Sequence, residues 1–178
     1  MSAAVLAGPP LQSGAWFVDT TTADTGQVAT GYVDLVATPS TAAFSITGLT
    51  PGDSGYGLIT VRNSGPLSYR YAATQSASGS LPAAQLNIEV KAQTNATSCN
   101  ATSYAGNGSV VRSTTSMATS TVFGNPATGA HTGDRTVAAG ATEYLCVRLT
   151  LPTSAPSSTQ GSTLTSVFTF AAEQTTNN

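Results

Sequence analysis

Few residues of this chain could carry acid, base or metal chemistry, and their spacing forms no recognised active site. His131 is the single histidine among 178 residues, and Asp134 follows it in a glycine-rich loop. A catalytic zinc ion needs three protein ligands, and no motif of the HExxH kind is present. Serines are abundant enough to complete a triad with His131 and Asp134, but the GxSxG pattern of a nucleophile elbow is absent. We therefore expect the protein not to be an enzyme.

The carboxylates give no clearer signal. They include no closely spaced pair of the kind that glycoside hydrolases use. Asp24, Asp34 or Asp53 could offer oxygen ligands to calcium, yet none lies in the dense Asp, Asn and Gly spacing of a calcium-binding loop. We expect neither a metal site nor a cofactor.

Cys99 and Cys146 are the only two cysteines, and neither belongs to a CxxC or Cys/His cluster. This spacing argues against zinc or redox chemistry and favours a disulfide. In the chain-entropy description, closing a loop of this length stabilises a fold by about 3 to 4 kcal/mol, provided that the compartment is oxidising. The alternative is a pair of buried free thiols.

Three N-glycosylation sequons lie within one polar segment of the chain. They begin at Asn95, Asn100 and Asn107. Such triplets also arise by chance in a chain rich in Thr and Asn. We treat the three asparagines as possible glycosylation sites on an outward-facing loop.

The composition excludes several classes of function. Charged residues make up only 8% of the chain and the net charge is −2, so no basic stripe exists for nucleic acid. No apolar run approaches the roughly 20 residues that span a bilayer. A polar surface built from Ser, Thr, Asn and Gln is typical of secreted proteins, and low net charge does little to oppose self-association.

Short runs rich in Val, Ile, Thr, Tyr and Phe, separated by Gly, Pro and Asn, predict an all-β protein. Their number and spacing favour a two-sheet jelly roll or β-sandwich, formed as a single domain by residues 14–178. We expect one helical turn at Leu81–Leu86 and a long, partly irregular excursion between late strands, over Thr94–Gly133. The expected strands are Ala15–Thr20, Gly31–Ala37, Ala43–Thr47, Tyr56–Asn63, Ser68–Gln75, Leu86–Ala92, Ser109–Arg112, Thr136–Val137, Thr142–Leu151 and Thr163–Glu173.

One group of motifs carries a family resemblance. It consists of Gly14-Ala-Trp-Phe-Val-Asp-Thr20, of Thr25-Gly-Gln-Val-Ala-Thr-Gly-Tyr-Val-Asp-Leu35, and of Phe44-Ser-Ile-Thr-Gly-Leu-Thr-Pro-Gly-Asp-Ser-Gly-Tyr-Gly57 followed by Ile59-Thr-Val-Arg-Asn-Ser-Gly65. The sequence resembles the TasA/camelysin family of secreted bacterial and archaeal proteins, closely over residues 14–65 and weakly over 94–135. By itself, Pro51-Gly52 predicts a type II turn, in which Asp53 can bond nearby amides.

The resemblance implies the structural subunit of an extracellular filament, pilus-like or part of a biofilm matrix, that binds copies of itself. Subunits of this kind polymerise head to tail by donor-strand complementation, and the resulting filaments can bundle laterally. In this chain the donor would be the N-terminal arm, residues 1–13, through Ser2, Ala3, Ala4, Val5, Leu6 and Ala7, with Pro9-Pro10 as a stiff hinge that ends pairing. Camelysin relatives have been described as metallopeptidases, but this chain offers no ligand set for one.

Two alternatives stay open. Residues 1–13 could instead be a disordered tag or the remnant of a signal peptide. The domain could also be a monomeric cell-surface adhesin or carbohydrate-binding β-sandwich, since the same fold supports both functions. Exposed aromatic side chains would favour that alternative; Trp16 and Tyr56 are the candidates, although burial in the core explains both.

Overall fold

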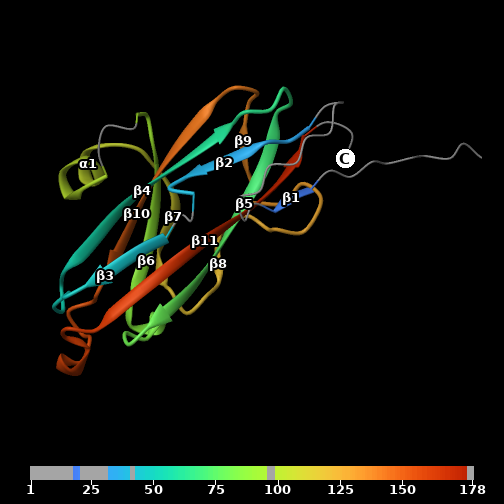
Figure 1. Ribbon diagram of the computed structural model, residues 1–178. Helices are drawn as coiled ribbons and strands as arrows, with labels where there is room; N and C mark the ends of the chain where they lie inside the picture. The colour runs from blue at the N-terminus through green and yellow to red at the C-terminus, as the bar shows by residue number, and fades with distance from the viewer. Residues whose placement is uncertain (1–17, 21–31, 41–42, 96–98, 176–178) are drawn as a thin grey trace, which may run out of the picture.

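The computed structural model describes residues 18–20, 32–40, 43–95 and 99–175. The predicted donor segment, Ser2–Ala7, together with Trp16 and Asp24, lies outside the described residues. Within the described part, the chain forms two antiparallel sheets that face each other, as Figure 1 shows. The predicted all-β fold and the β-sandwich are therefore confirmed.

The first sheet is built around its longest strand, β11. The strand β11 pairs with β5 along its length, while β3 and β1 share its other side, β3 at its start and β1 near its end. On the other side of β5, β9 pairs with Tyr69–Tyr71 and β8 pairs with Ala73 and Thr74. The bounds of these strands are β1 Val18–Thr20, β3 Ala43–Thr47, β5 Tyr69–Gly79, β8 Thr121–Phe123, β9 Arg135–Val137 and β11 Thr163–Gln174.

The second sheet has the strand order β2-β4-β10-β6-β7, and all of its pairs are antiparallel. A short helix, α1 (Ala101–Gly106), and two 3₁₀ turns, at Ala83–Gln85 and Ser157–Thr159, complete the described elements. The bounds of the strands are β2 Leu35–Thr38, β4 Ser54–Asn63, β6 Asn87–Gln93, β7 Ser109–Ser116 and β10 Thr142–Thr150.

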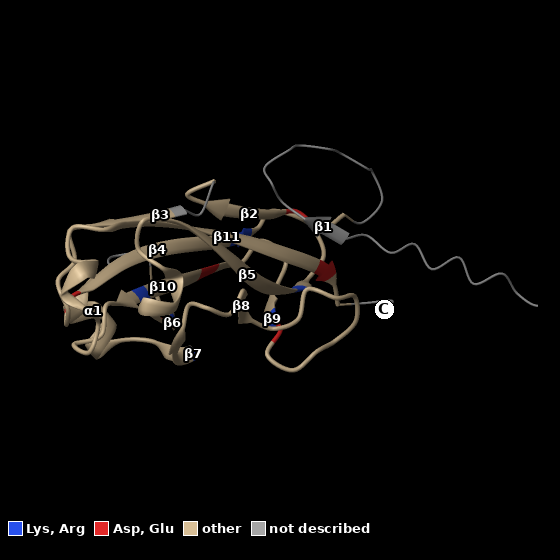
Figure 2. Cartoon of the chain, turned by 90° about the horizontal axis from the view of Figure 1, so that it is seen from below, with Lys and Arg blue, Asp and Glu red and all other residues tan. Residues whose placement is uncertain are grey.

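The core lies between the sheets and follows from the alternation of side chains along the strands. In β10, Leu145, Val147 and Leu149 point inward and are almost completely buried. From the facing sheet, Tyr71 packs edge-to-face on Phe123, with ring centroids 5.5 Å apart. Figure 2 shows how few charged residues the described chain carries and how widely they are scattered.

The excursion predicted over Thr94–Gly133 is less superficial than expected. It contains the whole of α1, β7 and β8, and it buries Met117 and Phe123 in the core. Its many Ser, Thr and Gly residues mask this contribution, because only isolated apolar side chains reach the core. The expected helical turn near Leu81–Leu86 is present as the 3₁₀ turn Ala83–Gln85.

Candidate functional site

One edge of β4 is open to a partner over part of its length. This strand has 10 residues, of which β2 pairs only with the four at its end, Thr60–Asn63. The strand β10 pairs with β4 over its other side. The first six residues of β4, Ser54–Ile59, therefore have no described strand on the β2 side.

The hydrogen-bond pattern identifies the groups that point from this edge. In antiparallel pairs, successive residues direct their N–H and C=O alternately to the two sides. The Asn63 N–H donates to the Ala141 carbonyl on the β10 side, so the odd-numbered residues of β4 bond to β10. The N–H and C=O groups of Ser54, Tyr56 and Leu58 accordingly face the open side.

Two glycines make a hollow beside this edge. Gly55 and Gly57 occupy inward-facing positions of β4, where the rest of the strand places Ile59 and Val61. The ring of Phe44 from β3 takes up the space of the missing side chain at Gly57, since a Cβ there would lie 1.7 Å from the ring. A Cβ at Gly55 would meet nothing closer than Ile46 at 3.6 Å.

The hollow has a volume of about 230 Å³ and lies between β3 and the start of β4. An apolar cavity of about 150 Å³ already accommodates a benzene-sized group, so there is room for at least one large side chain. We call this feature the β3–β4 groove. Its lining contains no charged residue and consists of Phe44, Ser45, Ile46, Thr47, Leu49, Gly55, Tyr56, Gly57, Val147 and Leu149.

The groove combines the two things that an added strand needs. The open edge offers backbone donors and acceptors that pair with no described strand, and the hollow at Gly55 offers an uncharged site for one side chain of an added strand. Sequence reasoning did not find this groove. The alternating glycines of Ser54-Gly-Tyr-Gly57 were the available signal, because glycine within a strand often marks a site where another backbone approaches closely.

The turn that leads into β4 forms as the sequence predicts. Gly52 has a positive φ of 102°, and the Asp53 N–H donates to the Thr50 carbonyl at 2.9 Å. The Asp53 carboxylate accepts from the Thr50 N–H and hydroxyl, at 2.8 and 2.6 Å. The hydrogen bond from the Thr50 hydroxyl, and to a smaller extent the one from the Thr50 N–H, lowers the pKa of Asp53. Its role is to hold the turn.

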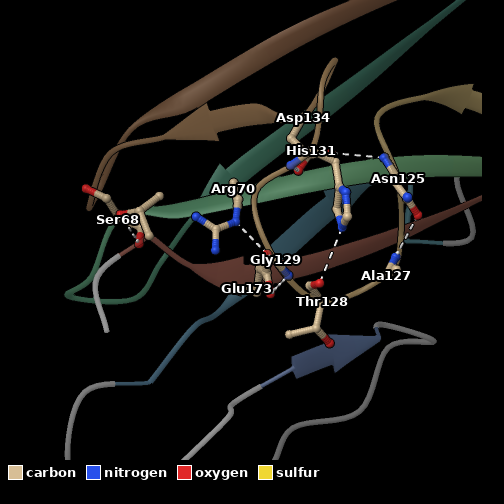
Figure 3. Close-up of polar contacts among 10 residues, drawn as sticks. Ser68, Arg70, Asn125, Ala127, Thr128, Gly129, His131, Asp134 and Glu173 are labelled. Atoms are coloured by element: carbon tan, nitrogen blue, oxygen red, sulfur yellow. Dashed lines mark hydrogen bonds and ion pairs between the residues drawn. The ribbon is translucent and has the colours of Figure 1, made fainter. Parts of the chain in front are cut away.

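His131 and Asp134, the residues first considered for catalysis, shape a loop instead (Figure 3). The Asp134 carboxylate accepts from the backbone N–H of His131 and of Asn125, at 2.8 and 2.9 Å. The neighbouring Glu173 pairs with Arg70 and accepts from the Gly129 N–H at 2.9 Å. Asp134 therefore holds the loop together, while Glu173 fixes it to β5 and β11.

Among the residues that the structure describes, no group of three or more His, Cys, Asp or Glu could hold a metal ion. Asp34 precedes β2, and Asp53 lies in the turn before β4. The calcium ligands considered from the sequence thus belong to different segments, and Asp24 lies outside the described residues.

The disulfide predicted from the sequence is present, since Cys99 is bonded to Cys146 of β10. Cys146 belongs to the outward-facing set of β10, so the bond fastens the segment before α1 to the outer face of the second sheet.

Tyr104 of α1 packs on the same face. The Lys91 ammonium lies 4.5 Å from its ring centroid and donates to the Tyr104 carbonyl at 2.7 Å. Tyr56, expected in the core, is half-buried on this outer face, 5.8 Å from the Tyr104 ring.

The three sequon asparagines are exposed and flank α1. Asn100 caps the helix, because its side-chain oxygen accepts from the Ser103 N–H while the Ser103 hydroxyl accepts from the Asn100 N–H. Asn107 follows the last turn, and Asn95 follows β6. All three side chains are placed where modification is sterically feasible, and glycosylation itself stays a prediction.

Comparison with known proteins adds no family. No family model matches the chain, and none of the curated proteins is similar to it. In the described part of the chain, no helix is long and apolar enough to cross a membrane. The disulfide fits an oxidising environment such as the extracellular space.

Proposed function

We propose that this protein is the structural subunit of an extracellular filament, and that copies join by adding a strand from one subunit to a sheet of the next. The observation that carries the proposal is the incomplete second sheet. Six residues of β4 have no strand partner on one side among the described residues, and they border a groove without charged side chains. A sheet edge of this kind is usually covered in a protein that stays monomeric.

The surface composition supports the proposal. A net charge of −2 on 178 residues supplies little repulsion between copies. The resemblance to the TasA/camelysin family points the same way, and it implies that the N-terminal arm, residues 1–13, is the donor. Because donor and acceptor are different surfaces of the same chain, the contact is head to tail and produces an open filament.

The alternative function, a carbohydrate-binding module, has less support from the surface. Such modules present exposed aromatic rings to sugar. Among the described residues, the aromatic side chain that is clearly exposed is Tyr32, at 39%. The ring of Tyr56 is engaged with Tyr104.

The proposal is tested by negative-stain electron microscopy of the purified full-length protein over a range of concentrations. We expect filaments of uniform width that appear above a threshold concentration. A variant that lacks residues 2–13 should remain folded and monomeric. Monodisperse particles from the full-length protein at every concentration would refute the filament, and unchanged filaments from the deletion variant would remove the donor role from the arm.

A further inference from the structure

We infer that the β3–β4 groove is the acceptor, and that its occupant is the segment Ser2–Ala7 of a second copy, paired with the Ser54–Ile59 edge of β4. This inference rests on the proposed function and adds the strand that receives the donor. In the assembled sheet, the donor would continue the line of β2 along β4.

Length and chemistry both match this occupant. The part of β4 that no described strand covers on this side has six residues, because β2 pairs with only four of its 10. The segment Ser2–Ala7 has the same length, carries no charge and contains Val5 and Leu6 as its large apolar side chains. Pro9-Pro10 follows directly and cannot continue the ladder. A charged or longer apolar segment would fit the groove less well.

The hollow at Gly55 distinguishes the two large side chains of the donor. Neighbouring residues of a strand point to opposite faces, so only one of Val5 and Leu6 can enter the hollow while the other faces outward. The entering side chain would pack against Ile46 of β3 and Leu149 of β10, which line the groove. The two positions should therefore respond very differently to a charge.

The position of β1 favours an occupant from a second copy. Val18 pairs with Glu173, whereas β3 pairs with Thr163–Val167 at the other end of β11. At about 3.3 Å per residue, Glu173 and Thr163 are roughly 33 Å apart. Figure 1 shows β1 and β3 at the two ends of this strand.

The direction of β1 also favours an occupant from a second copy. The chain enters β1 at Val18, opposite Glu173, and leaves it at Thr20, opposite Ala171. It therefore enters β1 at the end farther from the groove. To reach its own groove, the arm would have to reverse its direction just before Val18. The groove of the next subunit in a head-to-tail row requires no such reversal.

Substitutions in the full-length protein test the acceptor. Gly55→Leu fills the hollow from the acceptor side, and Gly106→Leu is the matched control, since nothing lies within 4 Å of a Cβ at Gly106. On the donor side, Val5→Asp and Leu6→Asp place a charge on opposite faces of the segment. Each variant is first checked for folding by thermal unfolding and circular dichroism.

We expect Gly55→Leu to raise the threshold concentration for filaments by at least about tenfold, equivalent to about 1.4 kcal/mol, with Gly106→Leu unchanged. One of Val5→Asp and Leu6→Asp should have a similar effect and the other a much smaller one. If both donor variants abolish filaments but a folded Gly55→Leu assembles normally, the arm is the donor and the acceptor lies elsewhere. If all variants assemble normally, the donor mechanism itself fails.

A binding measurement keeps the test independent of the stability of Gly55→Leu. A synthetic peptide of residues 2–10 is added to the donor variant that no longer assembles, and backbone amide shifts are followed by NMR. We expect the amides of Ser54, Tyr56 and Leu58 to shift, and a second variant that also carries Gly55→Leu to show no shift. Shifts confined to β7 or β8 would assign the acceptor to another edge and overturn the inference.

Discussion

Tyr71 brings a hydroxyl into the core of the sandwich, and two charged neighbours satisfy it. The ring is almost completely buried, between Phe123 and Phe170. Its hydroxyl donates to the Glu143 carboxylate, which also accepts from the Arg135 Nε at 2.7 Å. This arrangement ties β5 to β9 and β10 across the two sheets. Removing one member would leave the others buried with fewer partners.

The first prediction concerns Tyr71 at alkaline pH. Burial, followed by the charge and hydrogen bond of Glu143, raises the pKa of Tyr71 well above its ordinary value of 10.0. The unfolded chain loses this proton near pH 10, whereas the folded chain keeps it, so the stabilisation is complete below about pH 10 and is lost as the pH rises further. The free energy of unfolding should fall by about 1.4 kcal/mol per pH unit through this group. Urea unfolding between about pH 8 and pH 12 measures it.

Tyr71→Phe is the control for this effect. It should cost about 1 kcal/mol at neutral pH, because one hydrogen bond is lost while Arg135 still pairs with Glu143. Its stability should decline less steeply above pH 10. An equally steep decline in both proteins would show that Tyr71 is not responsible.

At the scale of elements, strands with clear alternation could be predicted from the sequence almost residue by residue. The strand predicted at Thr142–Leu151 is β10, Thr142–Thr150, and that predicted at Thr163–Glu173 is β11, Thr163–Gln174. In both, every second position faces the core, and these positions are mostly apolar; in β11 the exceptions are the buried Ser166 and Gln174.

Other elements depend on contacts that no local pattern records. Helix α1 has six residues and no apolar period; the Asn100–Ser103 capping box, the disulfide and the Lys91 bond to Tyr104 hold it in place. The β3–β4 groove exists because β3 pairs with β11 and not with β4. The sequence shows Gly55 and Gly57, but it does not show which strands become neighbours.

The second prediction concerns the disulfide as the fastening of the α1 segment. The bond closes a loop of 47 residues in sequence separation, for which the chain-entropy description gives about 4 kcal/mol. Replacing both Cys99 and Cys146 by Ser should lower the free energy of unfolding by up to this amount. Hydrogen exchange should accelerate mainly at the amides of α1, while β10 and β11 stay protected. Loss of protection throughout both sheets would mean that the disulfide holds the core and not only the excursion.

At the scale of the whole molecule, the distribution of charge decides how assembly should respond to salt. The three ion pairs of the described residues, Arg70–Glu173, Arg135–Glu143 and Arg148–Glu89, each lie within one chain. Neither the groove lining nor the segment Ser2–Ala7 contains a charged side chain. If copies associate through this groove, the contact consists of backbone hydrogen bonds and apolar burial, which screening by salt does not weaken.

The last prediction follows from this charge distribution. The Debye length falls from about 10 Å at 0.1 M to about 3 Å at 1 M salt, so an assembly driven by charge would weaken strongly across that range. For strand addition in the groove, the threshold concentration for filaments should change by less than about threefold, and downward, since salt does not oppose apolar burial. Sedimentation of filaments in sodium chloride at several concentrations measures the threshold. A threshold that rises by an order of magnitude or more with salt would show that charged surfaces outside the groove join the subunits.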